Sequence, residues 1–360
     1  PIYIDGRNSA MFYGASMIYK PLATMLLVQE MFNQKHKNIA MRIGEQIPYD
    51  SFAHLALETQ AKVKLFKKHL YRLAKDKGPL FKTQKAIAHP EDRILLKKAV
   101  EACPLLGETS DGKQIYLYQY QQSSPVLREI GRLREIAFRA VGEGSGQRRD
   151  IDQYDSYYEQ LILWDQDDLE IVGAYRFANT AKVMAEKGLA GLYTASLFQF
   201  NPQMTPYLDQ GLELGRSFVQ PRYWGKRSLD YLWYGIGAYL KQNPEIRYLF
   251  GGVSLSNSYP KAARDLMVYF YSLYFRCPEQ SAVPNIPYEL PMDTLSQLQQ
   301  HFSGDNYSQD FVQLKHLLAN MGVSIPTLYK QYSELTEPGG VRFLAFGVDP
   351  DFAAGPPLAE

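Results

Sequence analysis

One short apolar stretch of this 360-residue chain carries both an acid and an arginine. Residues 211–219 read Gly-Leu-Glu-Leu-Gly-Arg-Ser-Phe-Val, which predicts a buried strand bearing Glu213 and Arg216. A buried carboxylate is a candidate general base, and an arginine can hold an anionic group by bidentate hydrogen bonds. The two residues lie on opposite faces of an ideal strand, so a bulge is needed to bring both to one site.

The loop after this strand has the composition of a phosphate site. Pro221 ends the strand, and apolar residues return at helical spacing from Leu229 onward. Between them lie three cations and a glycine: Arg222, Gly225, Lys226 and Arg227. A strand, a cationic loop and a helix start together present free backbone N–H groups to a phosphate.

This region resembles the central motif of the GNAT acyltransferases, whose cofactor loop follows an Arg/Gln-x-x-Gly-x-Gly/Ala pattern. Arg222-x-x-Gly225-x-Arg227 keeps the first two elements and has Arg in place of the second small residue. A bulky Arg crowds the position of the CoA pyrophosphate, and this departure fits the branch that takes acyl chains from acyl carrier protein. Glu213-x-x-Arg216 resembles the signature of the acyl-homoserine-lactone synthases in that branch.

Three upstream motifs resemble those synthases in the same order. They are Arg134-x-x-x-Phe138, Asp152-x-x-Asp155 and Gly173-x-x-Arg176. An aromatic residue that the synthases carry after the Phe is missing from the Gly-rich residues 141–146. Residues 127–135, that Gly-rich run and residues 249–254 are more similar to the ornithine-lipid N-acyltransferases and to the long bacterial proteins called hemolysins.

The resemblance implies roles for individual residues. Glu213 is the expected base, with Arg216 and Arg176 beside it; the other interpretation is a structural ion pair between Glu213 and one of these arginines. The residues expected to bind the acceptor are Arg134, Phe138, Asp152, Asp155 and Ser254. In the other interpretation, Asp152 and Asp155 order the N-terminal part of the domain by binding Arg134 and Arg176. Those expected to bind the donor are Arg222, Gly225, Lys226, Arg227 and Asn257, and a tyrosine at 259, 269 or 271 would protonate the leaving thiolate.

We therefore expect an N-acyltransferase that moves a 3-hydroxyacyl chain to the amine of an amino acid such as ornithine, in aminolipid biosynthesis. The donor would be acyl carrier protein, with acyl-CoA as the other possibility. The alternatives are acyl-homoserine-lactone synthesis and a non-catalytic, membrane-associated protein of hemolysin type. We expect no metal, because the acids at 150–155 lack the Gly and closing Glu of a calcium loop, and no nucleic-acid partner.

The pattern of elements predicts a mixed α/β fold. The resemblance makes this a GNAT-like mixed, mainly antiparallel sheet with splayed central strands and flanking helices, plus an N-terminal α/β extension. Strands are expected at 115–120, 169–178, 192–200, 211–220, 248–254 and 341–348. Helices are expected at 58–76, 91–103, 126–141, 227–241, 260–275 and 311–321.

Residues 1–75 resemble the last part of a glycerolipid-type (lysophospholipid) acyltransferase domain. The His-x-x-x-x-Asp motif of that family is absent from the whole sequence, which predicts an inactive remnant. Residues 76–110 would form a basic helical connector, residues 111–350 the GNAT domain and residues 351–360 a frayed tail.

The chain has a net charge of +1, but its positive charge is concentrated in one segment. Residues 61–100 hold twelve Lys/Arg against three acids, which suits a solvated helix face, an anionic lipid surface or an acidic carrier protein. Two cysteines fit a reducing cytoplasm, and neither a signal peptide nor an apolar run of about 18 residues is visible. We expect a cytoplasmic protein that attaches peripherally to the inner membrane.

This attachment is testable by flotation with vesicles of graded anionic-lipid content. Each Lys or Arg close to an anionic bilayer contributes about 1 kcal/mol, so binding should rise with anionic lipid and fall with salt. Protein that stays in the soluble fraction at every lipid composition and at low salt would make residues 61–100 an ordinary solvated surface.

Overall fold

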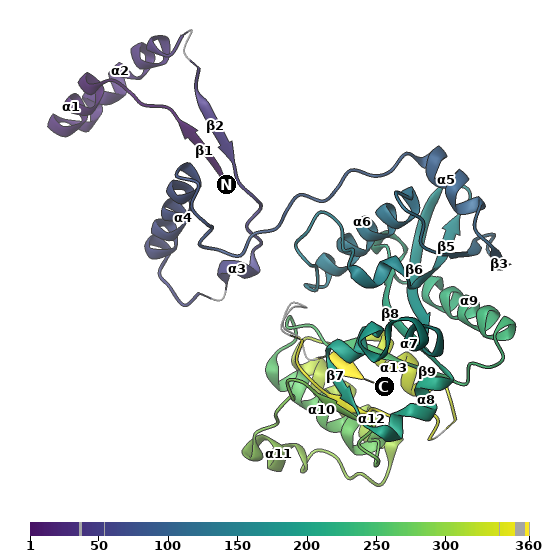
Figure 1. Cartoon of the computed structure of the whole chain (residues 1–360). Helices are drawn as coiled ribbons and strands as arrows, with labels where there is room; N and C mark the ends of the chain where they lie inside the picture. The colour runs from purple at the N-terminus through teal and green to yellow at the C-terminus, as the bar shows by residue number, and fades with distance from the viewer. Residues whose placement is uncertain (36–37, 54, 338, 350–356, 360) are drawn as a thin grey trace. The chain divides into compact units, whose positions relative to one another are not determined.

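The computed structural model describes residues 1–35, 38–53, 55–337, 339–349 and 357–359 (Figure 1). The chain divides into two compact units, Pro1–Ala86 and Ile87–Glu360. The division falls inside the predicted connector, so the basic residues 61–100 are shared between the two units and do not belong to one continuous element. None of the helices in the described ranges is long and apolar enough to cross a bilayer.

The first unit is small and joins a two-stranded antiparallel sheet to four helices. Ser9 caps α1 by accepting a hydrogen bond from the Phe12 N–H, and its own backbone N–H donates to Glu30 of α2. Large apolar side chains, including Met17 and Met25, remain exposed on these helices. The elements are β1 (Ile2–Asp5), α1 (Ala10–Ile18), α2 (Lys20–Asn33), β2 (Ala40–Ile43), α3 (Asp50–Ala53) and α4 (Thr59–Ala74).

The second unit is built on a sheet whose strands, as far as the described residues show, follow the order β11-β12-β9-β8-β6-β5-β4-β3. Neighbouring strands are antiparallel except for β8 and β9, which run parallel. The strands are β3 (Leu105–Glu108), β4 (Gln114–Tyr118), β5 (Glu159–Asp165), β6 (Glu170–Asn179), β8 (Gly211–Val219), β9 (Tyr248–Ser254), β11 (Ala345–Phe346) and β12 (Pro357–Ala359). A separate antiparallel pair joins β7 (Phe198–Phe200) to β10 (Ala282–Pro284).

Helices flank this sheet, so the expected mixed α/β, GNAT-like fold is confirmed (Figure 1). They are α5 (Arg93–Glu101), α6 (Pro125–Ala140), α7 (Thr180–Lys187), α8 (Thr205–Asp209), α9 (Ser228–Gln242), α10 (Lys261–Phe275), α11 (Met292–Leu298), α12 (Tyr307–Asn320) and α13 (Thr327–Glu334).

The two faces of the sheet carry separate apolar cores, as strand alternation requires. Ile115 and Leu117 of β4 pack in the cluster that contains Leu232 and Ile236 of α9. Tyr116 and Tyr118, the alternate residues, pack in the cluster that receives α5 and α6. The helices therefore fix the sheet from both sides.

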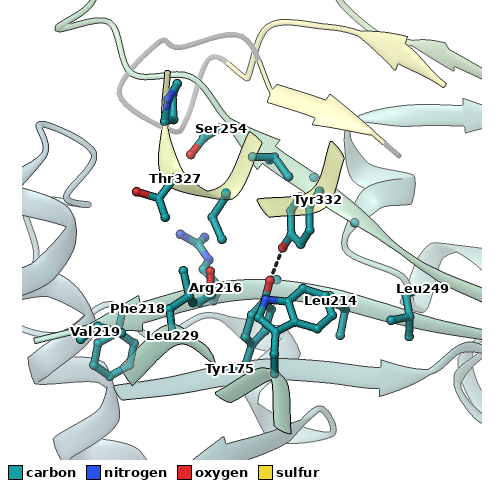
Figure 2. Close-up of a pocket in the computed structure, with 18 of the residues that line it drawn as sticks. Tyr175, Leu214, Arg216, Phe218, Val219, Leu229, Leu249, Ser254, Thr327 and Tyr332 are labelled. Carbon is teal, nitrogen blue, oxygen red and sulfur yellow. Dashed lines mark hydrogen bonds between the residues drawn. The ribbon is translucent and has the colours of Figure 1, made fainter. Parts of the chain in front are cut away.

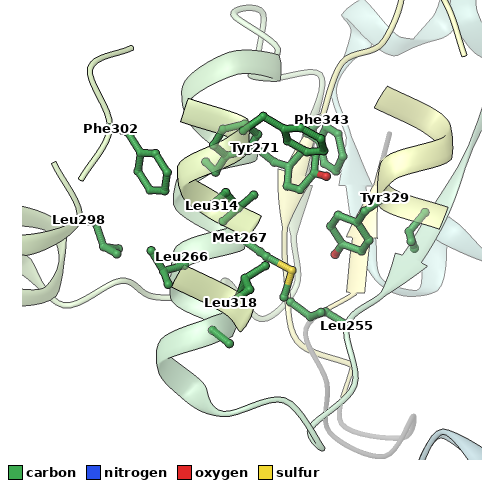
Figure 3. Close-up of a cluster of buried hydrophobic side chains, with 14 of the residues drawn as sticks. Leu255, Leu266, Met267, Tyr271, Leu298, Phe302, Leu314, Leu318, Tyr329 and Phe343 are labelled. Carbon is green, nitrogen blue, oxygen red and sulfur yellow. The ribbon is translucent and has the colours of Figure 1, made fainter. Parts of the chain in front are cut away.

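A third apolar cluster joins the C-terminal helices (Figure 3). Met267 and Tyr271 of α10 pack with Leu314 of α12, Tyr329 of α13 and the buried Phe343. This cluster holds α13 in place, and α13 in turn supplies part of the wall of the cavity described below.

Most predicted elements form, and two predicted strands are much shorter than expected. Of the predicted strand 192–200 only Phe198–Phe200 is a strand. Thr194–Ser196 form a short 3₁₀ turn, and the Thr194 N–H donates to the Glu213 carboxylate. Of residues 341–348 only Ala345–Phe346 is a strand. The predicted frayed tail falls on residues 351–356 and 360, which lie outside the described residues, and on Pro357–Ala359, which pairs with β9. Strand β5 was not predicted, because its apolar run is short and has polar ends.

Two departures from regular pairing shape β8. Its register against β6 shifts between Ala174 and Arg176, and Arg216 adopts a positive φ of 49° at that point. This is the bulge that Glu213 and Arg216 require. On the other edge, β8 pairs with β9 only as far as Leu214 and Gly251, although both strands continue. The central strands are therefore splayed, as expected.

Two glycines of α9 test how closely this helix packs on the sheet. A Cβ at Gly235 would lie 2.8 Å from side-chain carbons of Ile115 and Leu161, whereas a Cβ at Gly237 would meet nothing within 4 Å. Gly235→Ala should therefore cost about 1–3 kcal/mol of stability through overpacking. Gly237→Ala, the matched control, should stabilise by up to about 1 kcal/mol through helix propensity. Equal effects on urea denaturation would contradict this packing.

Candidate active site

A cavity of about 970 Å³ opens where β8 and β9 separate (Figure 2). One side is lined by residues 214–219 of β8 and the other by residues 248–254 around β9. The end of α6, residues 223–226 and 228–229 and the start of α13 also contribute to the lining. A cavity of this size, with walls that are mainly apolar and several polar and charged groups, suits a ligand with a long apolar part and a polar end.

Arg216 is brought into this cavity by the bulge (Figure 2). Its Nη1 lies 3.5 Å from Asp150 Oδ2 and its Nη2 lies 3.5 Å from Asp152 Oδ2, and its guanidinium stands 5.6 Å from the centre of the Tyr193 ring. Both ion-pair distances are long for charge-assisted hydrogen bonds. The guanidinium therefore brings a positive charge to the cavity while it stays within ion-pair distance of both aspartates.

Behind Arg216 lies a buried cluster of arginines and aspartates. Arg134 Nη2 donates to Asp155 Oδ2 at 2.7 Å, and Arg176 Nη1 donates to Asp152 Oδ1 at 2.6 Å and to Asp155 Oδ1 at 3.2 Å. Arg134 and Arg176 are 0% and 1% exposed. None of these four residues lines the cavity, so the predicted contacts of Arg134, Asp152 and Asp155 with the acceptor and the predicted catalytic role of Arg176 stay predictions. The predicted pairing of the two aspartates with the arginines is present.

The charges in this cluster depend on one another. Burial alone would raise the pKa of Asp155, but the positive charges of Arg134 and Arg176 and the hydrogen bond from Arg134 lower it below its ordinary value. Asp152 and Asp155 also form a reciprocal capping box at the start of the 3₁₀ turn Gln153–Ser156. The cluster thus ties α6, that turn and β6 together beneath the cavity.

Glu213, the predicted base, lies on the same face of β8 as Arg216, and both side chains contact Tyr193. Its carboxylate accepts hydrogen bonds from the backbone N–H of Thr194 at 2.6 Å and of Tyr193 at 3.2 Å, and from the Tyr158 hydroxyl. Burial raises its pKa, and these hydrogen bonds offset only part of that rise. Glu213 does not line the cavity, whereas Tyr193, whose backbone it holds, does. Glu213 therefore holds the backbone at Tyr193, and through it the Tyr193 ring, at the cavity.

The predicted donor residues divide into two groups. Gly225, with φ of 74°, and Lys226 line the cavity next to the first turn of α9. Arg222 instead pairs with Asp168 and Glu170, and Arg227 lies 3.7 Å from Asp230 on α9. Asn257 accepts a hydrogen bond from Arg264. These last three residues do not line the cavity.

Of the remaining predicted residues, Phe138 and Ser254 line the cavity. Among the candidate tyrosines, Tyr259 lines it, Tyr271 is buried in the C-terminal cluster and Tyr269 packs against that cluster. Two cavity carboxylates, Glu143 and Asp349, were not singled out from the sequence. The signal for Glu143 was its place in the Gly-rich run 142–146 directly after a helix.

Within the part of the chain that the structure describes, no group of three His, Cys, Asp or Glu side chains is arranged to hold a metal ion.

Comparison with known proteins decides the family. Residues 133–234 match the model of the acetyltransferase (GNAT) domain. The glycine N(alpha)-acyltransferase of Bacteroides thetaiotaomicron is 36% identical over 263 residues, which cover 69% of this chain and 78% of that protein. The chain belongs to the GNAT N-acyltransferases.

Other relatives of this GNAT N-acyltransferase match shorter parts. The L-ornithine N(alpha)-acyltransferase of Brucella abortus is 33% identical over 36% of this chain and 50% of its own length. The lyso-glycine lipid O-acyltransferase of Phocaeicola vulgatus is 36% identical over 58 residues, 14% of this chain and 21% of that protein. A solved CoA-dependent acyl-homoserine lactone synthase covers 52% of this chain and 89% of its own at 15% identity, with a TM-score of 0.29.

The GNAT N-acyltransferase is thus an enzyme of the acyltransferase class. The motifs at Arg134, Asp155, Arg176 and Arg216 form one connected structure, as their common resemblance implied. That structure is a support for the cavity, and only Arg216 of these four reaches it.

Removing the Asp155 charge tests this support. Asp155→Asn leaves two buried guanidinium groups short of a counter-charge, so it should cost about 3–5 kcal/mol of stability. The pKa of Asp155 is lower in the folded state than in the unfolded state. The Asp155 charge therefore contributes its full stabilisation above the unfolded-state pKa of about 3.9. This stabilisation is lost as the pH falls through the folded-state pKa. The stability difference between wild type and variant, measured by thermal melting, should therefore shrink under acid.

Asp168→Asn is the control for this measurement, because its pair with Arg222 is about half exposed. It should cost less than about 1 kcal/mol. An Asp155→Asn variant as stable as this control would contradict a structural role for the cluster.

Proposed function

We propose that this enzyme transfers a fatty acyl chain from a thioester donor to the α-amine of a small amino acid, in the biosynthesis of an aminolipid. The observation that carries the proposal is the cavity at the splay of β8 and β9, which combines apolar walls with the guanidinium of Arg216. The names of the relatives, glycine and ornithine N(alpha)-acyltransferases, support an amino-acid acceptor.

The walls of the cavity fit an acyl chain. Leu214, Phe218 and Val219 come from β8, and Leu229 and Trp233 come from α9 (Figure 2). Burying each methylene of a fatty chain against such walls is worth about 0.8 kcal/mol. The chain would therefore contribute most of the donor's affinity for the enzyme.

The first turn of α9 fits the phosphate of a phosphopantetheine arm. Ser228 and Leu229 begin this helix at the cavity, and Lys226 lines the cavity just before them. Helix N-terminal N–H groups and a lysine are a ready anion site. Arg222 and Arg227 are about 49% and 61% exposed in their side chains, which suits contact with an acidic carrier protein at the mouth. We therefore place acyl carrier protein ahead of CoA as the donor.

Arg216 would hold the carboxylate of the acceptor. Asp152 and Asp155, which were predicted to bind either arginines or a cationic substrate end such as the side-chain ammonium of ornithine, bind the arginines of the cluster. This arrangement favours an acceptor without a charged side chain, such as glycine, over ornithine.

The reaction needs a neutral amine and a stabilised oxyanion. The amine nitrogen attacks the thioester carbon, the C–N bond forms, and the C–S bond then breaks with its electron pair leaving on sulfur. Backbone N–H groups of a splayed strand can hold the oxyanion meanwhile. Beyond Leu214 and Gly251 the two strands face each other without pairing, so their edges offer such groups to the cavity.

The first unit would be a remnant of an O-acyltransferase. A relative named lyso-glycine lipid O-acyltransferase matches 14% of the chain, and an O-acyl step is chemically the next one for an N-acylated amino acid that becomes a two-chain lipid. Lys67 and Lys68 of α4 are exposed and could contribute to the membrane attachment predicted above. Both ideas remain predictions.

Mass spectrometry of the products tests the proposed function. The full chain is incubated with 3-hydroxyacyl carrier protein or the matching acyl-CoA and with single amino acids. N-acylglycine or another N-acylated amino acid, formed faster from the carrier protein, would support the proposal. Acyl-homoserine lactone as the product, or free fatty acid alone, would contradict it.

The lysine at the mouth gives a specific prediction. Lys226→Ala should raise the donor KM about tenfold, as expected for one lost charge-assisted contact, and leave the acceptor KM unchanged. The donor KM of the wild type should rise with ionic strength, and that of the variant should rise less. Steady-state kinetics over a salt series measures both effects.

Lys241→Ala removes an exposed lysine from the last turn of the same helix and is the matched control. It should keep the wild-type KM and salt response. If Lys226→Ala behaves like this control, the donor phosphate binds elsewhere.

A further inference from the structure

The loop after α6 carries a carboxylate into the cavity. Glu143 follows the end of the helix by three residues and lines the same space as Arg216 and Ser254. It is one of two carboxylates that line this cavity among the described residues, the other being Asp349. Its position is built by contacts on both sides of the loop.

On the helix side, a fully buried carboxylate fixes the turn. Glu135 of α6 accepts hydrogen bonds from the backbone N–H of Ser145 at 3.0 Å and of Gly146 at 2.8 Å. The backbone N–H of Glu143 itself donates to the Phe138 carbonyl at 2.8 Å. The Gly-rich run is therefore held in one path and is not a free loop.

On the strand side, the end of β9 holds both the loop and its carboxylate. The Ser254 hydroxyl donates to Glu143 Oε2 at 2.9 Å, and the Ser256 hydroxyl donates to the Val141 carbonyl at 3.0 Å. Glu143 lines the cavity, and Figure 2 shows Ser254 and Arg216 extending into the same space.

The surroundings of Glu143 suit a proton acceptor. Burial raises its pKa, while the hydrogen bond from Ser254 and the charge of Arg216 lower it in part. Tyr259 faces it as well, and the negative charge of Glu143 contributes to the raised pKa of that phenol. A carboxylate whose pKa is nearer to neutrality is a stronger base.

We propose that Glu143 and Arg216 form the acceptor subsite, in which Glu143 binds the amine and takes its proton while Arg216 binds the carboxylate. This inference rests on the proposed N-acyltransferase function. The pair is complementary to a zwitterionic α-amino acid, which presents one ammonium and one carboxylate on a single carbon.

The proton balance follows from this placement. Glu143 takes one proton from the incoming ammonium, and the neutral nitrogen attacks the thioester carbon. As the C–S bond breaks, the nitrogen loses a second proton and the leaving thiolate gains one, which gives an amide and a thiol. The proton on Glu143 then passes to solvent, so one proton is released per turnover.

Two other acids lie near the site. Both oxygens of Glu213 accept hydrogen bonds away from the cavity. Asp349 lines the cavity, and the Tyr193 hydroxyl donates to it at 3.4 Å. These two residues and Glu143 can therefore be compared directly by the same isosteric change.

The test measures kcat/KM for glycine over a pH series, with the full chain and 3-hydroxyacyl carrier protein as donor. In the wild type the rate should rise with pH as Glu143 loses its proton. Glu143→Gln should lower kcat/KM by about 10²-fold or more and flatten that rising limb. Glu143→Asp should recover part of the rate. Glycinamide, whose amine is less basic than that of glycine, should show a smaller defect in Glu143→Gln.

Glu186→Gln makes the same chemical change at an exposed position of α7 and should behave as wild type. Thermal melting confirms that each variant is folded. A normal rate and rising limb in Glu143→Gln would overturn the inference, as would loss of that limb in Glu213→Gln or Asp349→Asn alone. These results would overturn the role of Glu143 but not the proposed N-acyltransferase function. If the wild type acylates no amino acid from either donor, both the proposed function and this inference are overturned.

Discussion

The structure depends on the point at which β8 and β9 stop pairing. A parallel pair normally continues as far as both strands extend, but here it ends at Leu214 and Gly251. A Cβ at Gly251 would lie 2.1 Å from the Leu214 carbonyl, so the strands approach very closely just before they separate. The cavity is the space that this separation opens, and the bulge at Arg216 turns a charged side chain into it.

A cavity between two unpaired strand edges must be supported from outside. The Arg134–Asp155–Arg176 cluster binds α6 to β6, and Glu213 binds the turn at Tyr193 and Thr194 to β8. Buried ion clusters are costly to desolvate and seldom add net stability. We therefore interpret them as specifying one arrangement of α6, β6 and β8, so that side chains reach the cavity from fixed positions.

Much of this arrangement could be predicted from the sequence, because it is local. The alternation of residues 211–219 predicted both the strand and the need for a bulge, and the apolar spacing after Arg227 predicted α9. The roles of single residues were harder. For Arg134 and Asp155 the sequence left two roles open, pairing with each other or contact with the substrate. The pairing that is present depends on the folding of two separate segments.

Glu143 is a site residue that could not be recognised from the sequence, because its partners lie far from it along the chain. A glutamate among glycines suggests a solvated loop, and nothing near it in the sequence indicates a partner. Its position follows from Ser254, 111 residues further along, and from Glu135 beneath the loop. The turn at 192–197 was mistaken for a strand for a similar reason, because its backbone N–H groups bind a side chain of β8.

The central claim is that the acyl donor occupies the space between β8 and β9. Photo-crosslinking tests it directly, with a phosphopantetheine thioester whose acyl chain carries a diazirine, followed by mapping of the labelled peptides by mass spectrometry. The account predicts labels in residues 214–219, 248–254 and α13, and less labelling when unlabelled acyl carrier protein competes. Labels confined to other parts of the chain would contradict it.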